Sequence, residues 1–260
     1  MADARPLILI PSFNTGPILL ETVTAALSLG TPVWVVFDGS TDGSPELIRD
    51  LETAGHQSFR IIHLEVNSGK GAAVLHGLRE AVQAGFSHVL TMDADGQHPA
   101  HRVPEFFKLS AAHPEAAVFG RPVFDASAPA LRVNGRKISN FWANLETLGW
   151  GVDDSLFGMR LYPAHDLLEV LESTPFARRF DFDPEVAVRL AWRGVPVINL
   201  PTPVRYPSKE EGGISQFRYF RDNTLLTWMH LRLVFGFLGR LPLLAARGSN
   251  PLDHLSPPVR

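Results

Sequence analysis

The amino-acid sequence predicts an α/β fold in which a mostly parallel sheet carries helices on both faces. Short apolar, β-branched runs alternate with helix-length segments through the first half of the chain. This is the pattern of repeated strand–helix–strand units. Polar and acidic residues follow directly after three of the apolar runs. Because ligands of open α/β sheets bind at the carboxyl ends of the strands, these residues mark the expected site.

The first half is predicted to alternate between strands and helices. The strands cover residues 7–10, 33–37, 59–64 and 88–92. The helices cover residues 18–29, a segment that opens at Ser44 and Pro45, and residues 71–84. Serine is a favourable N-cap and proline is tolerated in the first turn, so this pair marks a helix start.

The second half is less regular. Its predicted strands cover residues 117–120 and 195–200, and its predicted helices cover 136–148 and 185–192. Residues 126–130 and 207–215 are predicted to be loops because they are small, polar or glycine-bearing. We therefore divide the chain into an α/β domain over 1–222, a hydrophobic or amphipathic helical segment over 223–247, and a flexible, proline-rich tail over 248–260.

The composition fits a globular protein without a general affinity for nucleic acid. The chain has 260 residues, 45% hydrophobic and 20% charged, and a formal net charge of -3. This is enough apolar material for a full core, and any anion site must be local. The absence of cysteine excludes disulfides, thiolate nucleophiles and cysteine-bound zinc. It suits a reducing compartment, and we expect a cytoplasmic protein.

Asp93 and Asp95 are the first candidates for chemistry. They stand one residue apart just after a predicted buried strand, where two carboxylates would repel each other without a cation. Hard divalent ions take oxygen ligands and bridge to phosphate oxygens, so the pair indicates a Mg²⁺ or Mn²⁺ site. A solvated acidic turn accounts for the same residues, and the pair alone does not decide between the two.

Two further motifs follow predicted strands. In Asn67-Ser68-Gly69-Lys70-Gly71 the glycines, the lysine charge and the following helix N-terminus suit an anion. The glycine spacing and final hydroxyl residue of a Walker motif are missing. Asp38 ends another strand and is placed to accept a hydrogen bond from a base or ribose. An ordinary connection and an ordinary turn remain the alternatives for these two motifs.

Taken in order, the motifs resemble family 2 inverting glycosyltransferases, whose fold is called GT-A. The resemblance covers roughly residues 6 to 218 and is strongest to polyprenol-phosphate (dolichol-phosphate) mannosyl and glucosyl synthases. It rests on Pro11-Ser12-Phe13-Asn14, Asp38-Gly39-Ser40-Thr41-Asp42-Gly43, Asn67-Ser68-Gly69-Lys70-Gly71, Asp93-Ala94-Asp95-Gly96-Gln97, Gly120-Arg121, Asp154-Ser155-Leu156-Phe157-Gly158-Met159-Arg160 and Phe182-Asp183-Pro184-Glu185.

The resemblance implies transfer of a sugar, with inversion, from a nucleotide-diphosphate sugar to a lipid or lipid-phosphate acceptor. Asp93, Asp95 and Gln97 would hold Mg²⁺ or Mn²⁺ on the donor diphosphate. Asp95 would be catalytic, together with acceptor-side carboxylates at Asp183 and Glu185. The implied substrate-binding residues are Pro11, Phe13, Asn14, Asp38, Lys70, Asp93, Arg121, Arg136, Asp154, Arg160 and Ser215.

The acceptor decides whether a base is needed. A hydroxyl acceptor requires a general base, for which Asp183 or Glu185 would serve. A phosphate acceptor is already ionised at neutral pH, and the carboxylates would then position it. Asp183 at a helix start is explained equally well by the helix dipole.

The chain departs from the family pattern at two points. Phe37 stands where the family has the first of two aspartates, and Gln216 stands where it has a lysine after Ser215, with Arg218 close by. A non-catalytic nucleotide-sugar-binding protein is thus an alternative, which Asp93 and Asp95 oppose. A nucleotidyltransferase should carry a basic glycine-rich loop at residues 11–16. A dehydrogenase should carry Gly-x-Gly-x-x-Gly after the first strand, and this sequence has neither motif.

The composition of residues 224–246 is relevant to whether the acceptor is a lipid. They combine Leu, Phe and Trp with Arg232 and Arg240, which is the mixture of an interfacial amphipathic helix. A helix packed on the domain's own core explains them equally well. Glycine, arginine and Pro242 interrupt the segment, so no membrane-spanning helix is predicted. Docking on a membrane would favour a lipid acceptor and place the protein at the inner face.

Overall fold

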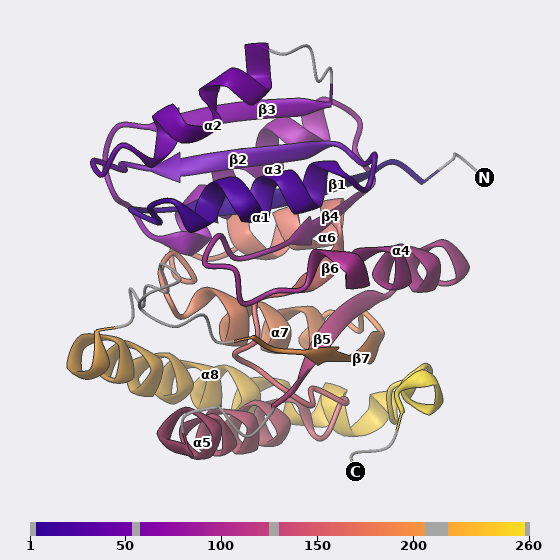
Figure 1. The fold of residues 1–260 in the computed structure, drawn as a ribbon. Coiled ribbons are helices and arrows are strands. Elements are labelled where there is room, and N and C mark those ends of the chain that lie inside the picture. The colour runs from indigo at the N-terminus through magenta and orange to yellow at the C-terminus, as the bar shows by residue number, and fades with distance from the viewer. Residues whose placement is uncertain (1–3, 54–57, 125–129, 206–217, 258–260) are drawn as a thin grey trace.

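The centre of the molecule is a seven-stranded sheet in the order β3-β2-β1-β4-β6-β5-β7 (Figure 1). The computed structural model describes residues 4–53, 58–124, 130–205 and 218–257. All neighbouring strands are parallel except β6, which is antiparallel to β4 and β5. The strands are β1 (Pro6–Ser12), β2 (Val33–Asp38), β3 (Phe59–Leu64), β4 (His88–Thr91), β5 (Ala117–Val123), β6 (Arg160–Pro163) and β7 (Val197–Pro203).

Helices cover both faces of this sheet, as predicted. Successive side chains of a strand point to opposite faces, so Leu7 and Leu9 of β1 join one core and Ile8 and Ile10 join the other. The first core is closed by α3, α6 and α7, and the second by α1, α2 and α4. The helices are α1 (Ile18–Leu27), α2 (Ser44–Thr53), α3 (Lys70–Gln83), α4 (Val103–Ala112), α5 (Ala130–Thr147), α6 (Ala164–Glu172), α7 (Phe182–Trp192) and α8 (Tyr219–Arg247).

Two helices, α5 and α8, form an outer layer. They lie side by side at the lower edge of Figure 1 and pack on α7 rather than on the sheet. A small separate core of Ala143, Val188, Met229 and Leu233 joins the three helices. Much of the apolar surface of α5 and α8 is left exposed, including Phe235 at 75%.

Helix α8 is continuous, which corrects the prediction that residues 224–246 are interrupted. Three of the interruptions have a local explanation, and Pro242 is accommodated inside the helix. Arg232 pairs with buried Glu185 at 2.9 Å, and Arg240 stacks over Trp192. Gly236 lies under the same indole, where a Cβ would come within 2.7 Å of the ring. As a result residues 220–247 are long and apolar enough to cross a membrane by length and composition alone, and 28% of the most apolar window is buried.

The segment after α8 is packed, which differs from the flexible tail predicted over 248–260. Asn250 is 5% exposed and donates to the carbonyl of Val197 at 2.7 Å. Ser256 Oγ accepts a hydrogen bond from the Asn199 amide at 2.9 Å. These contacts hold the segment against β7. The carbonyl of the last described residue, Pro257, accepts a hydrogen bond from Arg121. Of the predicted loops, 207–215 and 126–129 lie outside the described residues, and Ala130 already begins α5.

Candidate active site

A cavity of about 1110 Å³ opens at the carboxyl ends of β1, β2 and β4. Its floor is made by the strand ends and the start of α3, and its outer wall by α5 and α8. The predicted residues that line it are Pro11, Phe13, Asn14, Asp38, Lys70, Asp93, Asp95, Gln97, Arg136 and Asp183. The parallel topology therefore brings together residues that are far apart in sequence.

Four of the remaining predicted residues do not line this cavity. Arg121, Asp154, Arg160 and Glu185 are absent from its described lining. Ser215 lies outside the described residues, together with Gly213 and Gln216 of the same predicted loop.

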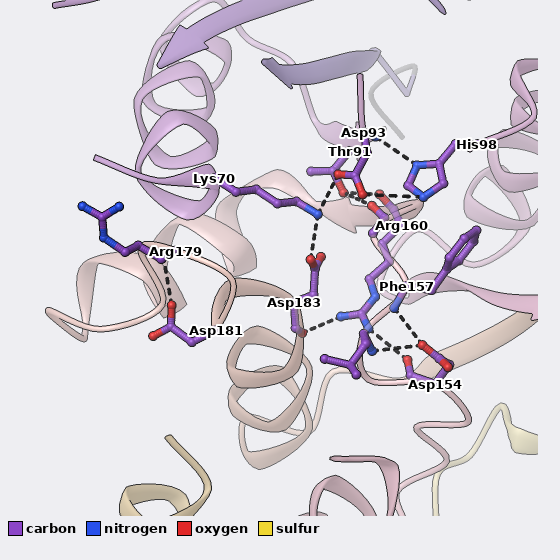
Figure 2. A network of polar contacts seen from close by, with 12 residues as sticks. Lys70, Thr91, Asp93, His98, Asp154, Phe157, Arg160, Arg179, Asp181 and Asp183 are labelled. Carbon is purple, nitrogen blue, oxygen red and sulfur yellow. Dashed lines mark hydrogen bonds and ion pairs between the residues drawn. The ribbon is translucent and has the colours of Figure 1, made fainter. Parts of the chain in front are cut away.

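Lys70 lies between two carboxylates at the centre of the cavity (Figure 2). Its ammonium is 2.7 Å from Asp93 Oδ1 and 2.7 Å from Asp183 Oδ2. Burial alone would lower the pKa of Lys70, but Asp183 and Asp93 together raise it above its ordinary value. Burial opposes ionisation of Asp93 as well, but the charge of Lys70 holds the pKa of Asp93 below its usual range. The result is a buried cation that joins β4 to the start of α7.

Asp183 keeps one oxygen unused within the described structure. Its side chain is 8% exposed, and Oδ1 is buried without a hydrogen-bond partner there. An unsatisfied buried acceptor is costly, and because Oδ1 is buried, a hydroxyl or a cation in the cavity would reach it only if the side chain turned. Its carbonyl accepts from Arg160 Nη1 at 2.6 Å, which fixes the start of α7.

His98 forms a hydrogen bond with the backbone of Asp93. Its Nδ1 accepts the Asp93 amide at 2.9 Å, which assigns the ring proton to Nε2. Burial lowers the pKa of His98 to about 4 despite the nearby Asp93. The imidazole is therefore neutral at pH 7 and acts as a hydrogen-bond acceptor for the backbone of the Asp93–Asp95 turn.

The predicted anion cradle at residues 67–73 is filled by the protein itself. Asp38 accepts the amides of Ser68 and Gly69 at 2.8 and 2.6 Å. The amide of Ala72 donates to the carbonyl of Arg178 at 3.0 Å. Gly69 faces the same backbone, where a Cβ would lie 2.9 Å from the Cα of Arg179. The glycines thus allow the loop before α7 to dock on α3, and Lys70 is the part of the motif that reaches the cavity.

Asn14 and Phe37 both have structural roles: Asn14 connects two loops by a hydrogen bond, and Phe37 packs in the core. Asn14 has a φ of 46° and its Oδ1 accepts the Thr41 amide at 2.7 Å, which ties the loop after β1 to the loop after β2. Phe37 is 1% exposed and stacks on His63 at 5.3 Å. Phe37, one of the two positions that depart from the family pattern, is therefore part of the core.

Arg136 is one of the arginines of the outer wall, together with Arg218 and Arg221 at the start of α8. It enters from α5, lines the cavity and pairs with Asp154 Oδ1 at 2.8 Å. Asp154 also accepts the amides of Leu156 and Phe157. Arg160 is fully buried and donates to the carbonyl of Asp154 at 2.9 Å. Asp154 and Arg160 therefore fix Arg136 and the loop behind it without reaching the cavity.

Glu185 does not fit the predicted role of a base. It is fully buried, and Arg189 Nε and Arg232 Nη1 share its Oε1 at 2.9 and 3.2 Å. Arg232 Nη2 binds Oε2 at 2.9 Å. With both oxygens committed to guanidinium groups, Glu185 joins α7 to α8.

Arg121 lies outside the cavity as well. Its guanidinium donates to Asp153 Oδ2 at 2.8 Å and to the carbonyl of Pro257 at 2.7 Å. The predicted phosphate contact does not fit this position, because the side chain holds the C-terminal segment against β5.

Several lining residues were missed by sequence reasoning. Ser139 lies one helical turn after Arg136 on α5, and this spacing of three was a usable signal. His230 on α8 and Arg179 before α7 carried no signal, since isolated histidines and arginines are common. The other residues that line this side of the cavity are Gly135, Ile138, Trp142, Leu156, Arg218, Arg221, Asn223, Leu226, Thr227, Leu231 and Val234.

The described residues contain no cluster of three or more histidines or carboxylates suited to a metal. Asp93, Asp95 and Gln97 nevertheless all line the cavity. Two carboxylates and an amide oxygen are the donors that Mg²⁺ takes when substrate phosphates and waters complete its shell. The donor set therefore fits a cation that arrives with a diphosphate.

Comparisons with known proteins agree with this geometry. Residues 7–166 match the family model described as Glycosyl transferase family 2. Polyprenol monophosphomannose synthase of Mycolicibacterium smegmatis is 27% identical over 214 residues, covering 80% of this chain and 79% of that protein. Undecaprenyl-phosphate mannosyltransferase of Micrococcus luteus is 25% identical over 217 residues, covering 76% of this chain and 82% of that protein.

Solved structures share the fold. Glucosyl-3-phosphoglycerate synthase from Mycobacterium tuberculosis, in complex with Mn²⁺, UDP and glucosyl-3-phosphoglycerate, superposes with a TM-score of 0.66. The match covers 92% of this chain and 81% of that chain at 17% sequence identity. The predicted GT-A fold is confirmed, with β6 as the antiparallel strand within it.

Proposed function

Since the chain belongs to glycosyl transferase family 2, we propose that it moves a sugar from a nucleotide-diphosphate sugar to a polyprenol-type lipid phosphate, with inversion. One observation carries the proposal. A single cavity joins the acidic strand ends at Asp93 and Asp95 to an outer wall that presents Arg136 among apolar side chains. The first end suits a diphosphate with its cation, and the second suits a phosphate with an apolar tail.

The donor is proposed to lie along the strand ends. Pro11, Phe13 and Asn14 line the cavity next to Asp38 and would border the nucleoside. Asp38 already accepts two backbone amides, so it would shape this end and offer only its remaining lone pairs. The positive charge of Lys70 at the centre would attract the diphosphate.

Asp93, Asp95 and Gln97 would hold Mg²⁺ or Mn²⁺ on the diphosphate. When bound, the cation would neutralise the charge that develops on the leaving nucleoside diphosphate. Lys70 would assist, because its ammonium already lies against Asp93. Asp95 Oδ1 accepts a hydrogen bond from the backbone amide of Gln97 at 3.1 Å, which closes a tight turn. This turn would set the direction of the Asp95 and Gln97 side chains.

The acceptor is proposed to enter between α5 and α8. Arg136 would bind its phosphate, and Asp183, which lines the cavity, would orient the attacking group. A phosphate is ionised at neutral pH, so Asp183 is assigned a positioning role. The named substrates of the two sequence relatives, both polyprenol-type phosphates, support this choice.

The exposed side of α5 and α8 is proposed to rest on the cytoplasmic face of a membrane. Its large exposed apolar residues are Ile138, Phe141, Leu145, Phe220, Trp228, Leu231, Phe235, Leu238, Leu241 and Leu243. We name these residues the apolar face. Ile138 and Leu231 belong both to the apolar face and to the cavity lining. A lipid chain could therefore pass from the membrane into the cavity without crossing water.

A thermal-shift panel of UDP-, GDP- and dTDP-sugars, each with and without Mn²⁺, tests the donor side. At least one donor should raise the melting temperature only with the metal, and Asp95→Asn should abolish this effect. Exposed Asp50→Asn on α2 is the matched control. Stabilisation that is independent of metal, or that survives Asp95→Asn, would contradict the proposed donor site. Radiolabelled transfer from the donor so identified to polyprenyl phosphate then tests the reaction.

A further inference from the structure

Ser139, His230 and Glu146 form a hydrogen-bonded series at the acceptor end of the cavity. His230 Nδ1 lies 2.9 Å from Glu146 Oε1, and His230 Nε2 lies 3.1 Å from Ser139 Oγ. Glu146 is fully buried, while Ser139 and His230 both line the cavity. The series thus runs from a buried carboxylate to a hydroxyl at the wall.

The protonation states of Glu146 and His230 decide which group donates and which accepts in each hydrogen bond of the series. An ionised Glu146 accepts the Nδ1 proton, so Nε2 of a neutral His230 accepts the Ser139 proton. If His230 gains a proton, its Nε2–H donates to Ser139 Oγ, and the serine hydroxyl is released toward the cavity. Imidazole is the side chain suited to such a change near neutral pH.

Few other charges act on the pair. From α7, Glu185 faces it but is neutralised by Arg189 and by Arg232 of α8. Burial raises the pKa of Glu146, and the charge of Glu185 adds to this, while the hydrogen bond from His230 lowers it. The hydrogen bond with His230 is thus the interaction that favours the ionised Glu146 carboxylate.

Ser139 is also connected to the proposed phosphate contact. Ser155 Oγ donates to Ser139 Oγ at 2.9 Å, and its neighbour Asp154 holds Arg136. Arg136 and Ser139 lie one turn apart on α5, and both residues line the cavity. This arrangement suits a phosphate that is bound by the arginine and touches the serine.

We propose that Ser139, His230 and Glu146 take up the last proton of the acceptor phosphate. The P–O–H proton passes to Ser139 Oγ as the Ser139 O–H proton passes to His230 Nε2. This leaves a dianionic phosphate beside an imidazolium that Glu146 stabilises. The proton stays in the complex, and the phosphate gains the charge that makes it the better nucleophile. The inference rests on the proposed lipid-phosphate acceptor.

His230→Gln tests the proposal, because the Gln amide still accepts from Ser139 but cannot be protonated. Transfer to polyprenyl phosphate is measured as kcat/KM from pH 6 to pH 9. At pH 6 the variant should lose about a hundredfold or more, which is the usual range for acid–base catalysis. At pH 9 the free phosphate is already dianionic and imidazole is neutral, so the loss should shrink to about twofold.

Two further variants keep the test decisive if His230→Gln does not fold. Ser139→Ala should show the same pH-dependent loss. Glu146→Gln should likewise lose more activity at pH 6 than at pH 9, because the imidazolium formed in the complex loses its counter-charge. Equal losses at pH 6 and pH 9 would overturn the proton relay and leave the proposed function intact. Wild-type protein that transfers no sugar to polyprenyl phosphate would instead contradict the proposed function.

Discussion

Lys70 Nζ lies 2.7 Å from Asp93 Oδ1 in the interior of the cavity. An equal contact to Asp183 makes it the link between the acidic turn after β4 and the start of α7. Removing one partner of a buried ion pair destabilises the folded protein, because the other charge is left without compensation. The folded state therefore depends on the same lysine that is proposed to meet the donor diphosphate.

Lys70→Met should lower the free energy of unfolding by about 1 to 3 kcal/mol, since it leaves the buried Asp183 and the partly exposed Asp93 without their cation. Urea unfolding followed by circular dichroism measures the change. Lys108→Met, at an exposed position on α4, should leave the midpoint unchanged. An unchanged midpoint for Lys70→Met would mean that the two carboxylates find other partners.

Gly158→Ala tests how closely the loop before β6 approaches this ion pair. A Cβ at Gly158 would lie 2.5 Å from Lys70 Nζ and 2.6 Å from Asp93 Oδ2. Because displacements near 1 Å impair a preorganised site, donor affinity measured by thermal shift with Mn²⁺ should fall about tenfold or more. Gly239→Ala on α8, where a Cβ meets open space, should bind the donor as the parent does. Equal affinities for the two variants would refute a positional role for Gly158.

Strand periodicity predicted the part of the site that belongs to parallel strands. Asp38 and Asp93 each end an apolar run, and parallel strands bring such ends to one edge of the sheet. The strand β6 was not predicted, because it has four residues and includes the charged Arg160, whose partners lie elsewhere in the sequence. Local patterns do not reveal that an arginine will be fully buried.

The role of Glu185 was missed for the same reason. Its position at the start of α7 suits either a base or a helix-dipole contact. The choice depends on Arg232, which is 47 residues away on a helix whose own continuity was not predicted. The outer wall of the cavity, including Ser139 and His230, follows from how α5 and α8 pack on α7, and single-sequence patterns contain little information about such packing.

Tyr162 should make the protein less stable at alkaline pH. Burial raises the pKa of its phenol to about 12, whereas an unfolded tyrosine ionises near pH 10. Between these values the unfolded state loses a proton that the native state keeps, so stability falls as pH rises. The loss should total about 3 kcal/mol from pH 10 to pH 12. Tyr162→Phe should remove this part of the pH dependence of unfolding.

Absorbance at 295 nm checks the same assignment in the native state. The chain has three tyrosines, and one should titrate near pH 12 in the parent protein. That late step should be missing from Tyr162→Phe. A parent titration without a delayed step would show that the phenol is accessible to hydroxide.

The apolar face of α5 and α8 should bind lipid vesicles. Phe235 and Leu243 are 75% and 74% exposed, and transferring one such side chain from water contributes roughly 2 kcal/mol. Phe235→Glu and Leu243→Glu should each weaken flotation with anionic liposomes by about tenfold or more. Leu47→Glu, at an exposed position on α2, is the matched control and should float as the parent does. Arg232 is not a useful probe, because it is committed to Glu185. Equal flotation of all the variants, or none for the parent, would assign the apolar face to something other than a membrane.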